Sequence, residues 1–269
     1  MIPTGLGPAG SPAVAGRRSP GDLAVAALVL LWIPVVLVSD RGATLGEQHL
    51  LGVGSAALLL GLLLRESALV RLQVAVLVAY AMVVEYTFSV GLGAYEYRLD
   101  NVPLFVPPGH GLVYLAALCL GRSAALAAVR GWFVPGTAVV ALGYGLYGVT
   151  GADRPDAVGL FWAGCLVWFL WRGRAPLVYV AAFGVVTWLE LLGTALGTWA
   201  WAPIDPVLGV ITMGNPPSGV AGAYCYLDAA ALTLSPVLRR ASCLQEERRR
   251  GKTPGTKHSR ERHPDASGQ

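Results

Sequence analysis

Three acidic residues stand inside stretches of sequence that are otherwise apolar. Glu85, Glu190 and Asp228 have mostly Val, Leu, Ala, Gly and aromatic residues as neighbours along the chain. An isolated carboxylate in an apolar medium costs several kcal/mol, so such a residue faces a protein interior, finds hydrogen-bond donors or stays protonated. Because a neutral carboxylic acid can donate a proton, these three positions are candidate catalytic acids.

The three acids are expected at a similar depth, in one cavity that opens toward an outer surface. Glu85 precedes Gly93 by eight residues and Glu190 precedes Gly197 by seven. At a rise of 1.5 Å per helical residue, both acids would lie about 10–12 Å below that surface. No Lys, Arg or His is expected at this depth, so hydroxyl groups are the expected partners: those of Tyr86, Thr87, Tyr114, Thr187, Thr194, Tyr224 and Tyr226.

The same order of residues follows each of the first two acids. The matched positions are Glu85 and Glu190, Gly93 and Gly197, Tyr95 and Trp199, Tyr97 and Trp201, Asp100 and Asp205, and the proline pairs 107–108 and 216–217. This order predicts an internal duplication. Chance similarity among loop ends rich in glycine and aromatic residues is the alternative.

Polar and aromatic residues of the two matched loops are candidates for substrate binding. Rings just past helix ends are typical of an aromatic belt at a membrane surface, but they can also line a route to the acids. Asp100, Asp205 and Asn215 accompany them, and backbone N–H groups at the helix starts after VPPGHG and NPPSG can hold a polar or anionic group. His110 could shuttle protons to Glu85, although a capping or interfacial role is the alternative.

The composition predicts a membrane protein. Of 269 residues, 55% are hydrophobic and only 13% are charged, whereas soluble domains carry roughly a quarter of charged residues. We expect an all-α, polytopic bundle of about eight spans, of which the second and sixth are the least secure because they are short. The predicted spans are 23–38, 50–64, 72–92, 111–129, 133–149, 157–171, 177–196 and 219–238.

The distribution of arginine predicts the orientation of these spans. When the gaps between spans are sorted alternately, one side receives only Arg41, Arg98 and Arg154. Basic residues are retained on the cytoplasmic side, so both termini are predicted to be cytoplasmic in a protein of the cell membrane. Four spans in each half, about 21–130 and 131–240, would make the halves parallel repeats.

The two ends of the chain are predicted to be disordered. Residues 1–20 are rich in Gly, Pro and Ala, and residues 241–269 form a basic tail suited to anionic lipid headgroups, in preference to nucleic acid. The four cysteines are widely separated, with no spacing typical of a metal site, so no metal and no cofactor are predicted. The sequence also lacks motifs for nucleotide-driven pumping and serine hydrolysis.

One segment resembles a known family. The run Glu85, Gly91, Gly93, Tyr95, Tyr97 and Val102-Pro103 resembles the Glu…Gly…Gly-x-Tyr-x-Tyr…Val-Pro signature of carotenoid-biosynthesis membrane proteins typified by the bisanhydrobacterioruberin (carotenoid) hydratases. The resemblance implies a cofactor-free lyase that adds water to the terminal double bond of a long isoprenoid. Glu85 or Glu190 would then supply the proton, with the aromatic faces of Tyr95, Tyr97, Trp199 and Trp201 shielding the cation.

Two other functions fit the same residues. Parallel repeats and buried acids also suit a proton-linked carrier of a small or lipidic substrate. In a non-catalytic assembly protein, the acids would only fasten helices to one another.

Overall fold

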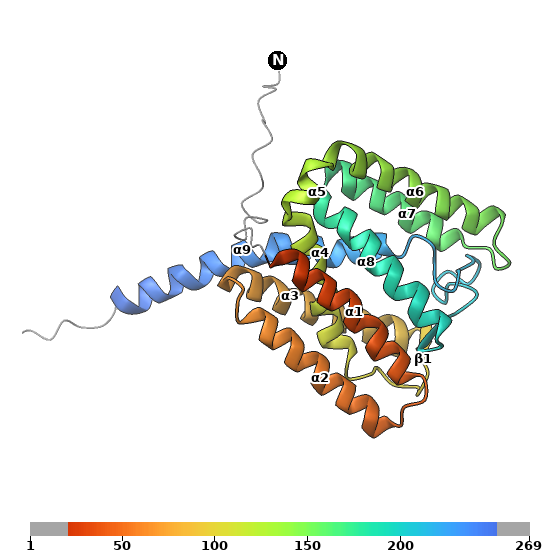
Figure 1. Ribbon diagram of the computed structural model, residues 1–269, viewed down its shortest axis with the longest axis horizontal. Helices are drawn as coiled ribbons and strands as arrows, with labels where there is room; N and C mark the ends of the chain where they lie inside the picture. The colour runs from red at the N-terminus through yellow and green to blue at the C-terminus, as the bar shows by residue number, and fades with distance from the viewer. Residues whose placement is uncertain (1–20, 252–269) are drawn as a thin grey trace, which may run out of the picture.

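Helices make up most of the chain between residues 21 and 251, which is the part described by a computed structural model (Figure 1). The α-helices of this part are α1 (Asp22–Asp40), α2 (Leu45–Leu63), α3 (Ala68–Glu85), α4 (Val106–Arg122), α5 (Ala124–Ala128), α6 (Arg130–Thr150), α7 (Ala157–Arg172), α8 (Pro176–Ala195) and α9 (Ala221–Gly251). A π-helix, η1 (Tyr86–Gly91), continues α3, and the two short strands are β1 (Tyr95–Tyr97) and β2 (Trp199–Trp201).

The predicted apolar runs coincide with these helices, which confirms the all-α class. Within residues 21–251, five helical segments are long and apolar enough to cross a membrane: α1, α2, α3 with η1, α6 and α8. The second predicted span, considered insecure from its length, is a 19-residue helix. The sixth, α7, is apolar but has only 16 residues. The fold therefore fits a membrane protein.

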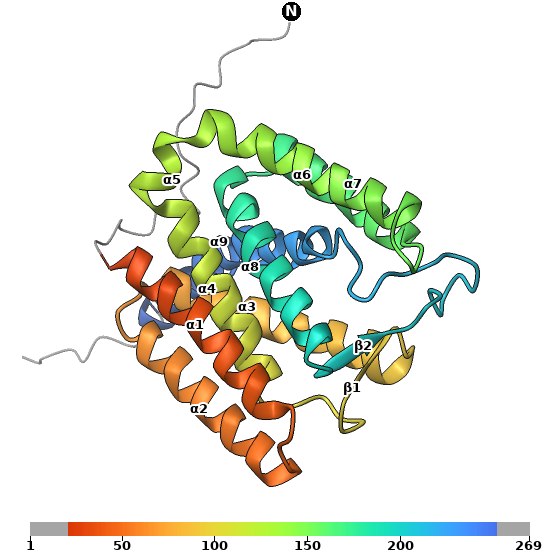
Figure 2. The ribbon, with the colours of Figure 1, turned by 45° about the vertical axis from the view of Figure 1, so that its right-hand side comes forward.

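The connections between helices gather at two opposite ends of the bundle (Figures 1 and 2). One end, which we call the sheet end, carries β1, β2 and the connections that follow α1, α3, α6 and α8. The other, the distal end, carries the connections that follow α2, α4 and α7. Polar caps fix several helix starts: Thr44 and Glu47 form a capping box at α2, and Ser67 accepts a hydrogen bond from the Val70 N–H at α3.

Helix α4 occupies the centre of the bundle. Every residue from His110 to Cys119 is buried, as expected for a helix enclosed on all sides. It packs against α1, α3 and α8, while α3 also packs against α9. At the distal end, Arg122 donates hydrogen bonds to both Asp22 and Glu66, which joins α4 to the start of α1 and to the α2–α3 connection.

Two features differ from the sequence-based expectation. The sheet was not predicted, because two strands of three residues give no periodic signal. The boundary at residue 240 is also wrong, since α9 continues as a helix through Gly251. Residues 1–20 and 252–269, including most of the predicted basic tail, lie outside the part that the structure describes.

The α7–α9 contact depends on a glycine. A Cβ at Gly222 would lie 2.0 Å from the carbonyl oxygen of Trp162 in α7, so Gly222→Ala should push the two helices apart. Overpacking of this kind costs roughly 1–3 kcal/mol, and a lower midpoint of thermal unfolding is expected for the variant purified in detergent. Gly164→Ala is the matched control, because no atom lies within 4 Å of its added Cβ. Equal midpoints for the two variants would contradict this account of the contact.

Candidate functional site

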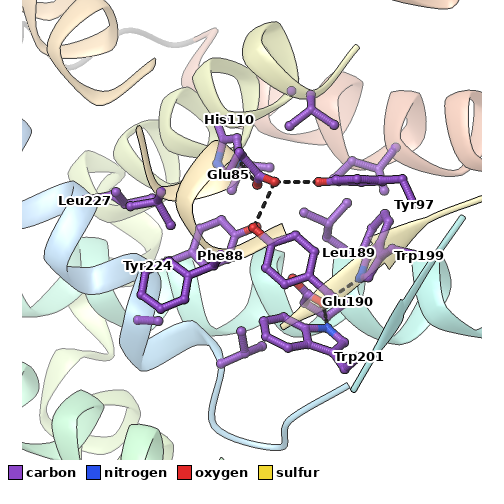
Figure 3. A pocket seen from close by; sticks show the side chains of 18 of the residues that line it. Glu85, Phe88, Tyr97, His110, Leu189, Glu190, Trp199, Trp201, Tyr224 and Leu227 are labelled. Atoms are coloured by element: carbon purple, nitrogen blue, oxygen red, sulfur yellow. Dashed lines mark hydrogen bonds and ion pairs between the residues drawn. The ribbon is translucent and has the colours of Figure 1, made fainter. Parts of the chain in front are cut away.

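Glu85, the last residue of α3, forms hydrogen bonds with the side chains of Tyr95, Tyr97 and His110. The hydroxyls of Tyr95 and Tyr97 donate to its Oε2 atom over 2.9 Å and 2.8 Å (Figure 3). The Nε2 atom of His110 lies 2.8 Å from Oε1. Glu85 and the ring of His110 are both buried, so these contacts replace the water that a carboxyl group needs.

The chain reaches this geometry by reversing just beyond η1. Gly93 has φ +67°, a left-handed conformation that glycine adopts readily. The reversal brings β1 back over the end of α3. Since alternate residues of a strand point to the same face, Tyr95 and Tyr97 turn inward together while Glu96 stays exposed.

Glu190, in α8, is held in a parallel way but by different donors. The indole N–H groups of Trp199 and Trp201 donate to its Oε2 atom over 3.0 Å and 3.2 Å. Gly197, with φ +74°, reverses the chain before β2. Gly193 makes room for the indole of Trp199, because a Cβ there would lie 2.0 Å from the ring.

The two strands pair with each other and bring the two acids together. They are antiparallel, with Tyr95 opposite Trp201 and Tyr97 opposite Trp199. The ring centroids of these pairs are 4.6 Å and 6.1 Å apart. Each acid is therefore covered by one strand, and the two strands form one ribbon across both.

A single cavity of about 410 Å³ includes both acids in its wall. Most of the wall is apolar and aromatic, and it is built by α1, α3, α4, α7, α8 and α9 together with the ribbon. One arm of the cavity runs along α1, where its wall contains Val29, Trp32, Ile33, Val36 and Leu37. Tyr80, Phe88 and Tyr226 also line the cavity, yet they are 40–45% exposed, so this side of the wall reaches the outer surface of the bundle.

His110 corrects one expectation. No basic side chain was expected at the depth of the acids, but His110, which the sequence marked as a possible proton shuttle to Glu85, lies one turn into α4 and contacts Glu85 directly. Its ring also stacks on Tyr224, with centroids 5.5 Å apart. The direct contact with Glu85 fits the proton-shuttle interpretation.

Most of the expected hydroxyl partners were wrong, although the hydroxyl of Tyr224 interacts with Glu190. Tyr86, for example, is 59% exposed. The four rings of the ribbon also donate hydrogen bonds to the acids. In an aromatic belt at a membrane surface, these rings would instead lie at the periphery of the bundle. Tyr95, Tyr97 and Trp199 are all buried. Glycine placement was the sequence signal for this arrangement, because a reversal at positions 93 and 197 sends the following rings back toward the acids.

Asp228 does not share the cavity. It is 4% exposed on α9, and its Oδ2 atom has no hydrogen-bond partner among the described residues. The groups that interact with it electrostatically include Tyr114, Tyr179 and Tyr224. Three acids were expected in one cavity, and the structure brings together two of them, Glu85 and Glu190.

The other predicted binding residues have mixed positions. Asp205 lines the cavity, and its Oδ1 atom accepts hydrogen bonds from the N–H groups of residues 207 and 208. Asp100 is an exposed turn residue with φ +54°. The side chain of Asn215 accepts a hydrogen bond from the backbone N–H of Trp201 over 2.9 Å, so it positions β2. It does not line the cavity.

Residues of the sheet end that support the ribbon were missed. Arg98, next to β1, contacts Asp40 and donates to the Ala43 carbonyl over 2.8 Å. Arg154 donates to the Trp201 carbonyl over 2.8 Å. Asp156 accepts from Gly214 N–H and from the Ser218 side chain, and thereby ties the loop after β2 to α7. The sequence did carry a signal for Arg98 and Arg154, because arginine is rare in the connections at this end of the bundle.

One group of side chains has the donor atoms of a metal site. Ligand atoms of Asp22, Glu66 and Cys119 lie within 4.8 Å of one another at the distal end. The Arg122 guanidinium already donates to both carboxylates, and a positive charge at that point opposes a cation. These residues are an ion-paired cluster remote from the acids.

The phenols of β1 are held in their neutral form. Burial, and then the negative charge of Glu85, raise the pKa of Tyr95 and Tyr97 well above the ordinary value. Both hydroxyls therefore keep the proton that they donate to Glu85. Together the two carboxyl groups, the imidazole and an apolar cavity can move a proton to or from an apolar molecule.

Searches among family models, curated proteins and solved structures found no match. The function therefore has to be inferred from the site itself.

The raised pKa of Tyr97 predicts its titration. In a spectrophotometric titration to about pH 11, roughly one unit above the ordinary tyrosine pKa, Tyr97→Phe should leave the phenolate signal of the folded protein unchanged. After unfolding in denaturant, the variant should lack the signal of one of the ten tyrosines. Since the folded state favours the neutral phenol, its stability should decline as the pH rises above about 10. A smaller phenolate signal in the folded variant would show that Tyr97 ionises normally.

Proposed function

We propose that this protein is a multi-pass enzyme of the cell membrane that transfers a proton to an apolar, isoprenoid-like substrate without a cofactor. One observation carries the proposal. Two buried carboxyl groups, each held by two aromatic donors, lie in the wall of one largely apolar cavity. Apolar walls exclude water, which strengthens any electrostatic interaction with a developing positive charge.

The proposed topology has eight spans and two parallel halves, with both termini in the cytoplasm. The arginine-rich connections occur at the distal end, as the positive-inside rule requires for a cytoplasmic face. The pairing of the two strands supports the duplication. A two-fold rotation about an axis that passes between Glu96 and Ala200 exchanges Tyr95 with Trp199 and Tyr97 with Trp201. The same rotation would exchange the α3–α9 contact with the α8–α4 contact.

The proposed substrate is long, apolar and dissolved in the membrane. The arm along α1 extends over about 12 Å from Leu37 to Val29, at 1.5 Å per residue, and its residues are apolar except for the hydrogen-bonded Trp32–Ser55 pair. Tyr80, Phe88 and Tyr226 would form the edge of an opening to the lipid. A membrane lipid could enter there without crossing water.

Hydration of an alkene is the reaction that the site and the family resemblance support best. A carboxylic acid delivers its proton to the less substituted alkene carbon, which leaves a tertiary cation. Aromatic faces stabilise this cation, and the oxygen of a water molecule then bonds to it. Loss of one proton from that oxygen gives the tertiary alcohol, so that the alkene gains one water and no oxidant is required.

A proton-linked carrier is the second candidate. The observation in its favour is η1, which interrupts the regular α-helix directly after Glu85. Transporter sites are typically formed by helices that depart from regular α-helical geometry, and π-helical turns often occur at functional sites. In a carrier, the substrate would leave chemically unchanged.

Isoprenoid analysis separates these functions. Cells that express the chain should contain an isoprenoid heavier by one water, absent from cells with Glu85→Gln or Glu190→Gln at equal protein levels. Proteoliposomes that move an unaltered lipid in response to a pH gradient would establish the carrier. Glutamine can still accept hydrogen bonds, so a protein in which the acids only fasten helices should tolerate both changes. An isoprenoid profile identical with and without the chain would refute hydration.

The arm along α1 predicts which substitution blocks binding. Val29 is completely buried in its wall, so Val29→Phe should fill the arm and weaken the binding of a polyene such as retinol by about tenfold or more, equivalent to roughly 1.4 kcal/mol. Quenching of the four cavity tryptophans, Trp32, Trp162, Trp199 and Trp201, reports the binding.

Two controls accompany this measurement. Val35→Phe places the same ring on the same helix at a residue that is 50% exposed, and retinol affinity should be retained. Val29→Ala enlarges the arm and should also bind. If Val29→Phe binds retinol as tightly as Val35→Phe does, the ligand does not occupy the arm.

A further inference from the structure

The two acids of the cavity differ in their surroundings although their positions are matched. Of the described residues that line the cavity, His110 is the only one with a basic side chain, and it contacts Glu85. Asp205 also lines the cavity, but backbone N–H groups already serve its carboxylate. Glu85 thus contacts a side chain that can become a cation, whereas among the described residues no such side chain contacts Glu190.

The donors of the two acids differ in what they can do. A phenol can donate or accept a hydrogen bond, but an indole N–H can only donate. The two indoles occupy Oε2 of Glu190, over 3.0 Å and 3.2 Å, and they require that atom to remain an acceptor. Any proton on Glu190 must therefore reside on Oε1.

Two arrangements of the cavity have no uncompensated ion: in both Glu190 is neutral, and Glu85 with His110 is either a neutral pair or a carboxylate–imidazolium pair. The second is favoured because two phenol hydroxyls also donate to Glu85, and hydrogen bonds to the charged form stabilise it. We propose that Glu85 is a carboxylate paired with protonated His110, and that Glu190 is a neutral acid with its proton on Oε1. Glu190 is the proton donor of the site, and Glu85 is the proton acceptor. A carboxylate at Glu190 would have hydrogen-bond donors but, among the described residues, no cation in contact with it, and a buried charge without a counter-ion is costly.

This division of roles specifies the direction of proton movement, and only this step rests on the proposed hydration. Glu190 loses the Oε1 proton to the alkene carbon and becomes a carboxylate. The oxygen of water bonds to the cation and loses its proton to the Glu85 carboxylate. A proton must return from Glu85 to Glu190 before the next turnover.

Infrared spectroscopy of the full chain in lipid nanodiscs tests the assignment without any substrate. A protonated carboxyl group has a carbonyl stretch that is separate from the carboxylate bands and shifts in D₂O. At neutral pH this band should be lost in Glu190→Gln and retained in Glu85→Gln. Asp228, which is buried outside the cavity, can contribute a band of its own, and Asp228→Asn identifies that contribution.

The second measurement concerns His110. In ¹⁵N-histidine-labelled protein, NMR should show both ring nitrogens of His110 protonated in the native chain. The ring should become neutral in Glu85→Gln and stay protonated in Glu190→Gln, whereas a merely structural pair of acids would show no such difference. Helical circular dichroism confirms that each variant is folded.

Each result has a defined meaning. Loss of the carboxyl band in Glu85→Gln, or its persistence in Glu190→Gln after subtraction of Asp228, would overturn the assignment. Neutral His110 in the native chain would do the same. Because neither measurement involves turnover, the assignment can hold even if isoprenoid hydration is refuted, and hydration can hold with the two roles reversed.

Discussion

The arrangement of this molecule depends on the cost of removing two carboxyl groups from water. An apolar bundle can keep Glu85 and Glu190 only if donors are supplied from within the protein. Four aromatic side chains supply them, and all four belong to a ribbon of six residues. The chain reversals at Gly93 and Gly197, the space left at Gly193 and the arginines beside the strands all keep this ribbon in place.

The site also combines properties that rarely occur together. Its walls are apolar enough to receive a hydrocarbon, yet they contain two carboxyl groups and an imidazole within direct contact of polar donors. The aromatic residues have two functions here, because their polar atoms bind the acids while their faces remain available to a cation. In the proposed reaction, the same small set of residues would hold a proton and also stabilise a positive charge.

Much of the helical architecture could be predicted from the sequence, because long apolar runs leave few alternatives to helices. The acids, the four rings and His110 were also identified from residue type and spacing. Their contacts were not. Depth along a helix predicted three acids at one level, but it does not specify the direction of a side chain, and Asp228 does not line the cavity that Glu85 and Glu190 share. The ribbon escaped prediction because a strand of three residues acquires its identity from its partner, which lies about a hundred residues away in the sequence.

The pairing of β1 with β2 means that neither acid has a cover of its own. Separation of the strands would remove donors from both carboxyl groups at the same moment and admit water to each. A loss of this pairing would therefore expose the two acids to water together.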